Sequence, residues 1–176
     1  MSVTPFFPNL IVGDDEYEFS HLVPFSHTLY GQGGDNATIR VRASFKSHVF
    51  STSPEGDENA DFQDENGKDR VFCQDRYNRS KHLPGLCLNA IITNALTWQS
   101  EDKNSISSLV VADDPLSTGL KYAVYYYLYP SKHDDYDVEL VVKSAYLKEI
   151  EAFRIKRRHK LLSLVRKCFF TGTTIP

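Results

Sequence analysis

Residues 70–98 read RVFCQDRYNRSKHLPGLCLNAIITNALTW, and this stretch decides the fold that we expect. In its second half, apolar side chains recur at steps of three and four residues, which is the period of an amphipathic helix. These side chains are Leu83, Leu86, Cys87, Ala90, Ile91, Ala95 and Trp98. Pro84 suits the first turn of such a helix. The pattern therefore predicts a core helix over residues 84–98.

The first half of the stretch is polar and rich in cations. Five side chains that bind anions or move protons lie within thirteen positions, with Tyr77 and Ser80 among them. The five are Arg70, Arg76, Arg79, Lys81 and His82. We expect a cationic loop whose side chains are held in place by the helix that follows. The alternative is that Arg76 and Arg79 only pair with acids such as Asp69 and Asp75.

Strand patterns lie on both sides of this helix. Residues 38–50 alternate between apolar and polar side chains, as a half-buried strand does. His48 falls at or just beyond the end of that strand, where it is either fixed for chemistry or merely partly exposed. After the helix, residues 107–112, 120–129 and 137–147 are predicted strands, the last two forming a hairpin. The fold class that these patterns predict is α+β, with the core helix packed on an antiparallel sheet.

The remaining segments complete the predicted organisation. Residues 1–37 are rich in aromatic side chains and are expected to form an arm packed on the domain. Residues 38–176 are expected to form one α+β domain, in which residues 53–69 make an acidic, mobile loop. Residues 153–170 predict a basic amphipathic helix that Gly172 stops. The alternative for the start of that segment, FRIK, is a continuation of the sheet.

Composition limits the class of protein. A chain of 176 residues with 41% hydrophobic content is long enough to bury one core. No apolar run reaches the roughly 18 residues of a membrane span, and the N-terminus lacks the pattern of a secretion signal. The three cysteines have no metal-ligand or redox spacing, which is typical of a reducing compartment. We therefore expect a cytoplasmic protein without a membrane partner; nothing in the sequence indicates its oligomeric state.

Charge is distributed unevenly along the chain. Residues 1–75 hold 5 basic and 13 acidic side chains, whereas residues 76–176 hold 15 and 10. A basic surface of this kind fits RNA or another polyanion, or an acidic protein partner; the alternative is a solvated helix face. The candidate nucleic-acid-binding residues are Arg79, Lys81, Arg154, Lys156, Arg157, Arg158 and Lys160.

Tyrosines occupy both faces of the strand predicted over residues 120–129. Tyr125, Tyr127 and Tyr129 share one face, and Tyr122 and Tyr126 share the other. Either both faces are covered, or one row of phenols is a surface on which bases stack.

A resemblance adds to these patterns. The series HVF, then RxFxxDRYxxSxxLP before a helix, then strands ending in VVKSAY resembles an uncharacterised group of bacterial and prophage-associated proteins over residues 45–146. The topology also resembles that of the small ribonuclease toxins of the barnase/RelE type, which cleave RNA without metal through His, Arg, Lys or Tyr side chains. This resemblance implies that His48 transfers protons and Arg76 clamps a phosphate. It assigns the third group, on the last strand, to Ser144 or Tyr146.

The residue types agree with such chemistry. Cleaving RNA without metal needs a group that moves protons near neutral pH and cations over the charge that develops on phosphorus. No HExxH, paired CxxC, GxSxG or Walker sequence is present, and the sequence indicates no metal and no cofactor. Two hypotheses follow. One is a ribonuclease, related to toxins or phage defence, in which His48, Arg76, Ser80 and Tyr146 share one cleft. The other is a non-catalytic module that binds nucleic acid or protein through its basic C-terminal helix and Tyr-rich sheet.

Overall fold

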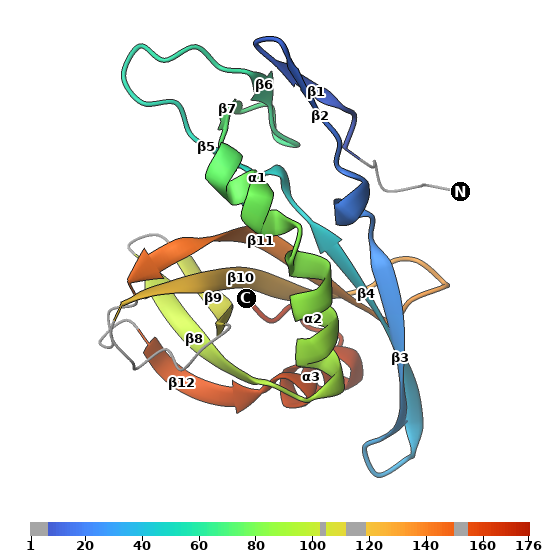
Figure 1. Ribbon diagram of the computed structural model, residues 1–176. Helices are drawn as coiled ribbons and strands as arrows, with labels where there is room; N and C mark the ends of the chain where they lie inside the picture. Colours follow the sequence, from blue (N-terminus) through green and yellow to red (C-terminus); the bar gives the residue numbers. More distant parts are fainter. Residues whose placement is uncertain (1–6, 103–104, 112–118, 150–154) are drawn as a thin grey trace.

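A seven-stranded sheet forms the centre of the computed structural model, which describes residues 7–102, 105–111, 119–149 and 155–176 (Figure 1). Its strand order is β12-β8-β9-β10-β11-β4-β3. The strands are β3 Phe25–Gln32, β4 Ala37–Phe45, β8 Leu96–Asp102, β9 Ser105–Val111, β10 Leu120–Pro130, β11 Val138–Glu149 and β12 Ile155–Lys160. Residues 1–6, Ala112 and Arg154, on which parts of the predictions fall, lie outside the described residues.

The α+β fold class is confirmed, and the three strands predicted after the helix are β9, β10 and β11. Each pairs with the next in antiparallel fashion, as the predicted hairpin requires. The sheet is nevertheless mixed, because β11 runs parallel to β4 between Val138 and Val142. A parallel pair needs a long crossover connection, and here the chain between β4 and β11 supplies it. The antiparallel arrangement expected for the three strands is confirmed, and the parallel pairing of β4 with β11 lies outside that expectation.

The segment predicted as an arm contributes a strand. Phe25–Gln32 forms β3, which pairs with β4 at the edge of the sheet. The hairpin of β1 (Leu10–Val12) and β2 (Asp15–Tyr17) and the 3-10 turn η1 (Ser20–Leu22) precede it. Phe19 and Leu22 are buried in the core, so these aromatic and aliphatic side chains fix the N-terminal segment to the rest of the fold.

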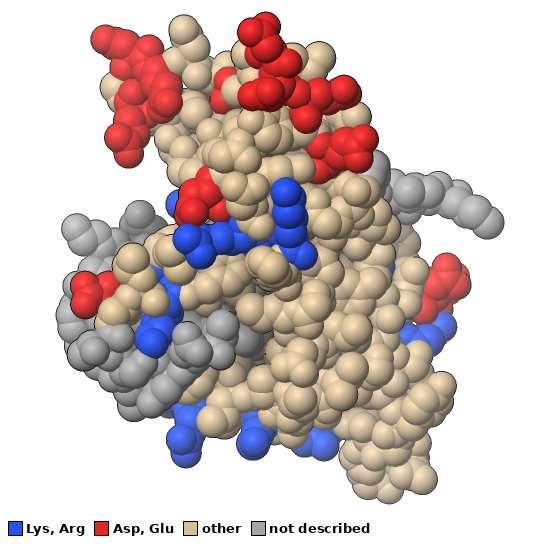
Figure 2. All heavy atoms as spheres, in the orientation of Figure 1, with Lys and Arg blue, Asp and Glu red and all other residues tan. Residues whose placement is uncertain are grey.

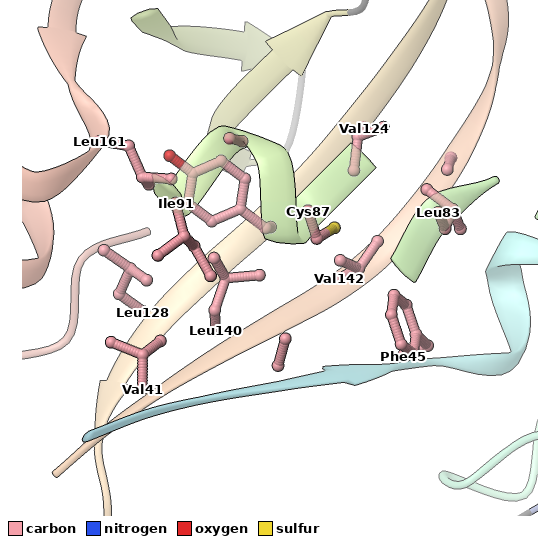
Figure 3. Packing of buried hydrophobic residues seen from close by; sticks show 14 of the residues in the cluster. Val41, Phe45, Leu83, Cys87, Ile91, Val124, Leu128, Leu140, Val142 and Leu161 are labelled. Carbon is pink, nitrogen blue, oxygen red and sulfur yellow. The ribbon is translucent and has the colours of Figure 1, made fainter. Parts of the chain in front are cut away.

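The core lies between the sheet and two helices, α2 (Leu83–Ile92) and α3 (Leu161–Thr171). Figure 3 shows Cys87 and Ile91 of α2 among side chains of β10 and β11, such as Val124 and Leu140. On β10 burial alternates from Val124 to Leu128, since Val124, Tyr126 and Leu128 are buried. Tyr125 and Tyr127 on the other face are half-buried, and Tyr129 is exposed.

The predicted core helix is real but shorter than expected. It ends at Ile92, and residues 93–98 leave it to begin β8 at Leu96. Asn94 adopts a left-handed backbone with φ 51°, and the Ala95 N–H closes the helix by donating to the Ala90 carbonyl. The boundary at residue 98 was therefore wrong, because Ala95 and Trp98 continued the apolar period only by coincidence.

The cationic loop before this helix is also structured. Asp69–Phe72 forms β7, which pairs with β5 (Ser51–Thr52) and β6 (Phe62–Gln63), and Gln74–Ser80 forms the helix α1. α1 lies beside β11, at the end of the molecule that carries the small sheet (Figure 1). The expected loop is wrong because Arg70 lies on a strand, while Arg76 and Arg79 lie on a helix.

The basic segment near the C-terminus divides between a strand and a helix. Ile155–Lys160 pairs with β8 as β12, which confirms the sheet alternative for Ile155 and Lys156; residue 153 also lies outside the described residues. The helix α3 follows and buries Leu161, Leu164, Val165 and Cys168, and Gly172 ends it with φ 62°. Lys156, Arg157, Arg158 and Lys160 thus lie on an edge strand, and the prediction that placed them on a helix was wrong. Among the described residues, no helix is long and apolar enough to cross a membrane.

Candidate active site

His48 lies in a single 3-10 turn, η2 (Ser47–Val49), that follows β4 directly. The Lys46 N–H donates to the Val142 carbonyl of β11, so the turn begins where the sheet still holds the chain. The Phe50 N–H closes the turn on the Ser47 carbonyl. The His48 side chain remains 36% exposed. The predicted placement of this histidine, at a strand end and within reach of solvent, is confirmed.

The His48 ring is held by a buried carboxylate. Its Nε2 lies 2.9 Å from Asp64 Oδ2, and the Asp64 side chain is fully buried. Asp64 Oδ1 accepts the N–H groups of Asn66 and Lys68 in the turn that follows it. The hydrogen bond from His48, aided by these N–H groups, lowers the pKa of Asp64 to about 2. Because an ionised carboxylate only accepts, Nε2 carries a hydrogen, and Nδ1 of the neutral ring carries the lone pair.

Two arginines meet behind this turn. Arg76 Nη1 donates to the carbonyl oxygens of His48, at 3.2 Å, and Ser51, at 2.8 Å. Arg70 Nη2 donates to the same Ser51 oxygen at 2.9 Å, and its other nitrogens bind the hydroxyls of Ser51 and Ser53. Burial lowers the pKa of Arg70, and the charge of Arg76 lowers it further. Two guanidinium groups that share one carbonyl oxygen create a local positive potential beside His48.

Arg76 also joins the turn to the sheet. Its guanidinium lies over the Tyr146 ring, 4.6 Å from the ring centre. Tyr146 in turn stacks on Tyr125, with ring centres 5.7 Å apart. The structure therefore brings together three of the four predicted catalytic residues, with Arg76 in contact with both the His48 backbone and Tyr146.

Ser80, the fourth, lies in a different place. It is fully buried, and its hydroxyl donates to the Tyr77 carbonyl at 2.7 Å. His21 Nε2 lies 2.8 Å from the same oxygen and must be the donor, because the hydroxyl hydrogen is already engaged. Burial lowers the pKa of His21, which favours the neutral ring. Ser80 thus fixes the last turn of α1 to η1 and is not accessible to a substrate.

The residues predicted to bind nucleic acid have different surroundings. Arg79 pairs with Asp75 at 2.9 Å, one helical turn earlier, as the alternative interpretation expected. Arg76 does not follow that alternative, since it binds backbone carbonyls. Lys81 is exposed and lies over the Tyr77 ring. On β12, the side chains of Lys156, Arg157, Arg158 and Lys160 are exposed.

Sequence reasoning missed Asp64 as a partner of His48. The signal that could have found it is the series Asp-Glu-Asn-Gly-Lys over residues 64–68, because an Asp followed two residues later by Asn-Gly is typical of a turn that the Asp side chain caps. Gly67 has φ 74°, as such a turn requires. The burial of that carboxylate depends on tertiary contacts, which the local series does not specify.

Charge is segregated on the surface as it is along the chain. Figure 2 shows acidic side chains at the end of the molecule that carries β1, β2 and the loop before β6. Basic side chains gather over α1 and again at the opposite end, over β12 and α3. Among the described residues, no group of three or more His, Cys, Asp and Glu side chains is arranged to hold a metal ion.

The fold and this site define an α+β protein with a mixed sheet, in which a His–Asp pair and two arginines gather at the end of β4. The chain belongs to the YjaZ family, whose model matches residues 9–169. No curated protein matches the chain. No solved structure matches it either. The match includes all of residues 45–146, on which the resemblance to an uncharacterised bacterial group rested. The likeness to ribonucleases of the barnase/RelE type and the association with prophages stay predictions from the sequence.

Proposed function

We propose that the protein is a small metal-independent ribonuclease that acts in a toxin or phage-defence setting. The proposal rests on the His48 ring, which the buried Asp64 carboxylate fixes, and on the Arg70–Arg76 pair, which binds backbone carbonyls of His48 and Ser51. A carboxylate that orients a histidine and stabilises its protonated form is a recurrent device of proton transfer. Adjacent guanidinium groups attract a phosphate and counter the charge that forms on it.

The proposed reaction is cleavage of a single phosphodiester bond. His48 Nδ1 takes the proton of a ribose 2′-hydroxyl, and the 2′-oxygen forms a bond to phosphorus while the bond from phosphorus to the 5′-oxygen breaks. The 5′-oxygen leaves with a proton from water, and the other product ends in a 2′,3′-cyclic phosphate. The imidazolium then returns its proton to solvent while Asp64 remains ionised.

Arg76 is the proposed phosphate clamp. In the part of the chain that the structure describes, both hydrogen bonds of its side chain come from Nη1, which leaves Nη2 and Nε for phosphate oxygens. Tyr146 supports the guanidinium from one side and has a positioning role. Ser80 takes no part in the proposed reaction because it is buried against His21.

The test is cleavage of a fluorescent single-stranded RNA by purified protein in the presence of EDTA. His48→Gln keeps an N–H that can reach Asp64 but cannot transfer a proton, so cleavage should fall by about 10² to 10⁴. His133→Gln, in the exposed turn before β11, is the matched control and should cleave normally. Arg76→Lys should also cleave poorly, because Lys cannot reproduce the planar, two-pronged grip, whereas Arg79→Lys should not.

The substrate provides a second control. An RNA with 2′-deoxyribose at the cleaved position should resist cleavage, because the proposed nucleophile is missing. Absence of cleavage by the wild-type protein, or normal cleavage by His48→Gln, would remove the ribonuclease proposal.

A second candidate function is a non-catalytic module that binds single-stranded nucleic acid. It is favoured by a row of rings and cations that begins at Arg76, Tyr146 and Tyr125. Farther along the hairpin, Lys143 Nζ lies 2.9 Å from the Tyr127 hydroxyl and over its ring, and Tyr127 contacts Tyr129 edge to face. Rings interleaved with cations are the surface on which single strands stack. Binding of RNA without cleavage, weakened by Tyr127→Leu but not by His48→Gln, supports this candidate over the enzyme.

A further inference from the structure

A cavity of about 540 Å³ lies beside the candidate active site. Three parts of the chain contribute lining residues: residues 7–24, residues 44–50 and residues 62–65. Its apolar wall is made mainly of phenylalanine rings, which are Phe7, Phe19, Phe45, Phe50 and Phe62. Phe50 and Phe62 stack with ring centres 5.7 Å apart. The volume and the aromatic lining are those of a pocket for a small molecule.

One side of the cavity is polar and carries two acids. Glu65 accepts the Ser47 N–H at 2.9 Å and the Ser47 hydroxyl at 3.2 Å, one bond at each carboxylate oxygen. A carboxylate can accept about four hydrogen bonds, so Glu65 retains capacity for a ligand. Asp64 also lines the cavity, and Lys46 is the cation among its lining residues. The lining therefore has an excess of negative charge.

The surroundings reinforce this sign. The acidic end of the molecule in Figure 2 is formed by β1, β2 and the loop before β6. Leu10 of β1 and Phe62 of β6 line the cavity. Within the cavity, a field of this sign disfavours anionic ligands and attracts cations. An apolar compartment with an anionic rim fits a ligand with a hydrocarbon body and a positively charged end.

We propose that this cavity binds an apolar small molecule that carries a protonated amine. The phenylalanine rings enclose the apolar body, and the ammonium group lies against Glu65, with Asp64 behind it. The cavity shares Asp64 with the proposed ribonuclease site but none of its phosphate-binding arginines, and this proposal does not depend on the ribonuclease proposal.

Calorimetric titration of the full chain with two matched indole probes tests the site. Tryptamine presents an ammonium group and indole-3-propionate a carboxylate on bodies of the same size. Tryptamine should bind, and indole-3-propionate should bind at least about fivefold more weakly, since an ion pair near the surface contributes up to about 1 kcal/mol. Glu65→Gln should remove most of that difference. Glu58→Gln, at an exposed acid of the loop before β6 and outside the lining, should leave it unchanged.

A filling variant tests the cavity itself. Ser44 is buried in the lining, and Ser44→Leu places apolar volume there without removing an apolar contact. Both probes should then lose binding while the variant still unfolds cooperatively on heating. Failure of tryptamine to bind the wild-type protein would overturn the proposal. Equal binding of the two probes, or a loss in Glu58→Gln equal to that in Glu65→Gln, would overturn it as well.

Discussion

The lowered pKa of Asp64 makes the stability of the protein depend on pH in the acidic range. This pKa is about 2 in the folded protein and ordinarily 3.8, so the folded state holds the ionised form more strongly than the unfolded chain does. The stabilisation is therefore fully present above about pH 4 and is lost as the pH falls toward 2. We expect the free energy of unfolding to decrease steeply over that interval.

Asp64→Asn should make the free energy of unfolding depend less on pH between about pH 2 and pH 4. Above pH 4 the variant should be less stable by about 1.5–3 kcal/mol, the usual contribution of a hydrogen bond to a charged group. The measurement is urea unfolding at several values between pH 2.5 and pH 6. Asp57→Asn, at an exposed position of the loop before β6, is the control and should behave as the wild type does. If the free energy of unfolding of Asp64→Asn still fell with pH as in the wild type, other carboxylates would dominate acid unfolding.

The histidine could be predicted and its partner could not. The alternation of residues 38–50 located His48 at a strand end because a strand pattern depends on local sequence alone. Asp64 and Arg70 acquire their roles through the small sheet β5–β7–β6. Its strands β5 and β6 are two residues long, which is too short for an alternating pattern of apolar and polar residues to be recognised in the sequence. Ser80 was assigned to the site from its proximity in sequence, and the helical turn of α1 directs it to His21 instead.

At the scale of elements, Asn94 joins two helices. Its left-handed backbone ends α2, and its Oδ1 accepts the Leu162 N–H at 3.0 Å in the first turn of α3. Asn94→Ala should cost about 2–3 kcal/mol, since alanine is strained in this conformation and cannot cap. Asn94→Gly relieves the strain and loses only the cap, so it should cost less. Chemical unfolding of both variants checks this order, and a glycine variant less stable than the alanine variant would contradict it.

The exposed basic side chains of the edge strand β12 lead to a prediction about how RNA affinity depends on salt. If the exposed Lys and Arg side chains of β12 contact phosphates, the affinity for single-stranded RNA should decrease steeply as the salt concentration increases, because each contact releases counterions. Arg157→Glu with Arg158→Glu should reduce the slope of log affinity against log salt by about 1.4, or about 0.7 for each contact. Arg166→Glu with Lys167→Glu on α3 changes the charge equally and is the matched control. If both double variants showed the same slope of log affinity against log salt, the effect would come from net charge alone.

Strands that alternate over many residues were predicted within a few positions, as β10 and β11 illustrate. The end of α2 was not, because Ala95 and Trp98 fit the helical period although Asn94 had already turned the chain. Lys156–Lys160 was ambiguous for a related reason. A short basic segment before an amphipathic helix has no period of its own, and its pairing with β8 decides its structure.

At the scale of the whole molecule, the parallel contact of β4 with β11 joins segments 97 positions apart. Arg40 binds Asp137 and Arg42 binds Glu139, each at 3.0 Å, so both arginines of β4 are neutralised from the later segment. Pairings this distant in sequence form slowly, since a long loop must close before any contact is gained. The sheet is complete only when the last third of the chain has joined it.

During synthesis, this order has a consequence for the nascent chain. The β3–β4 hairpin leaves the ribosome about a hundred residues before β11, which at about 5–20 residues per second amounts to about 5–20 seconds. For that time one edge of β4 offers unpaired N–H and C=O groups to the same edge of neighbouring nascent chains. Arg40 and Arg42 carry uncompensated charge in the same interval and repel their counterparts on those chains. The two arginines would thus protect the growing polypeptide from aggregation before they serve as ion-pair partners in the finished protein.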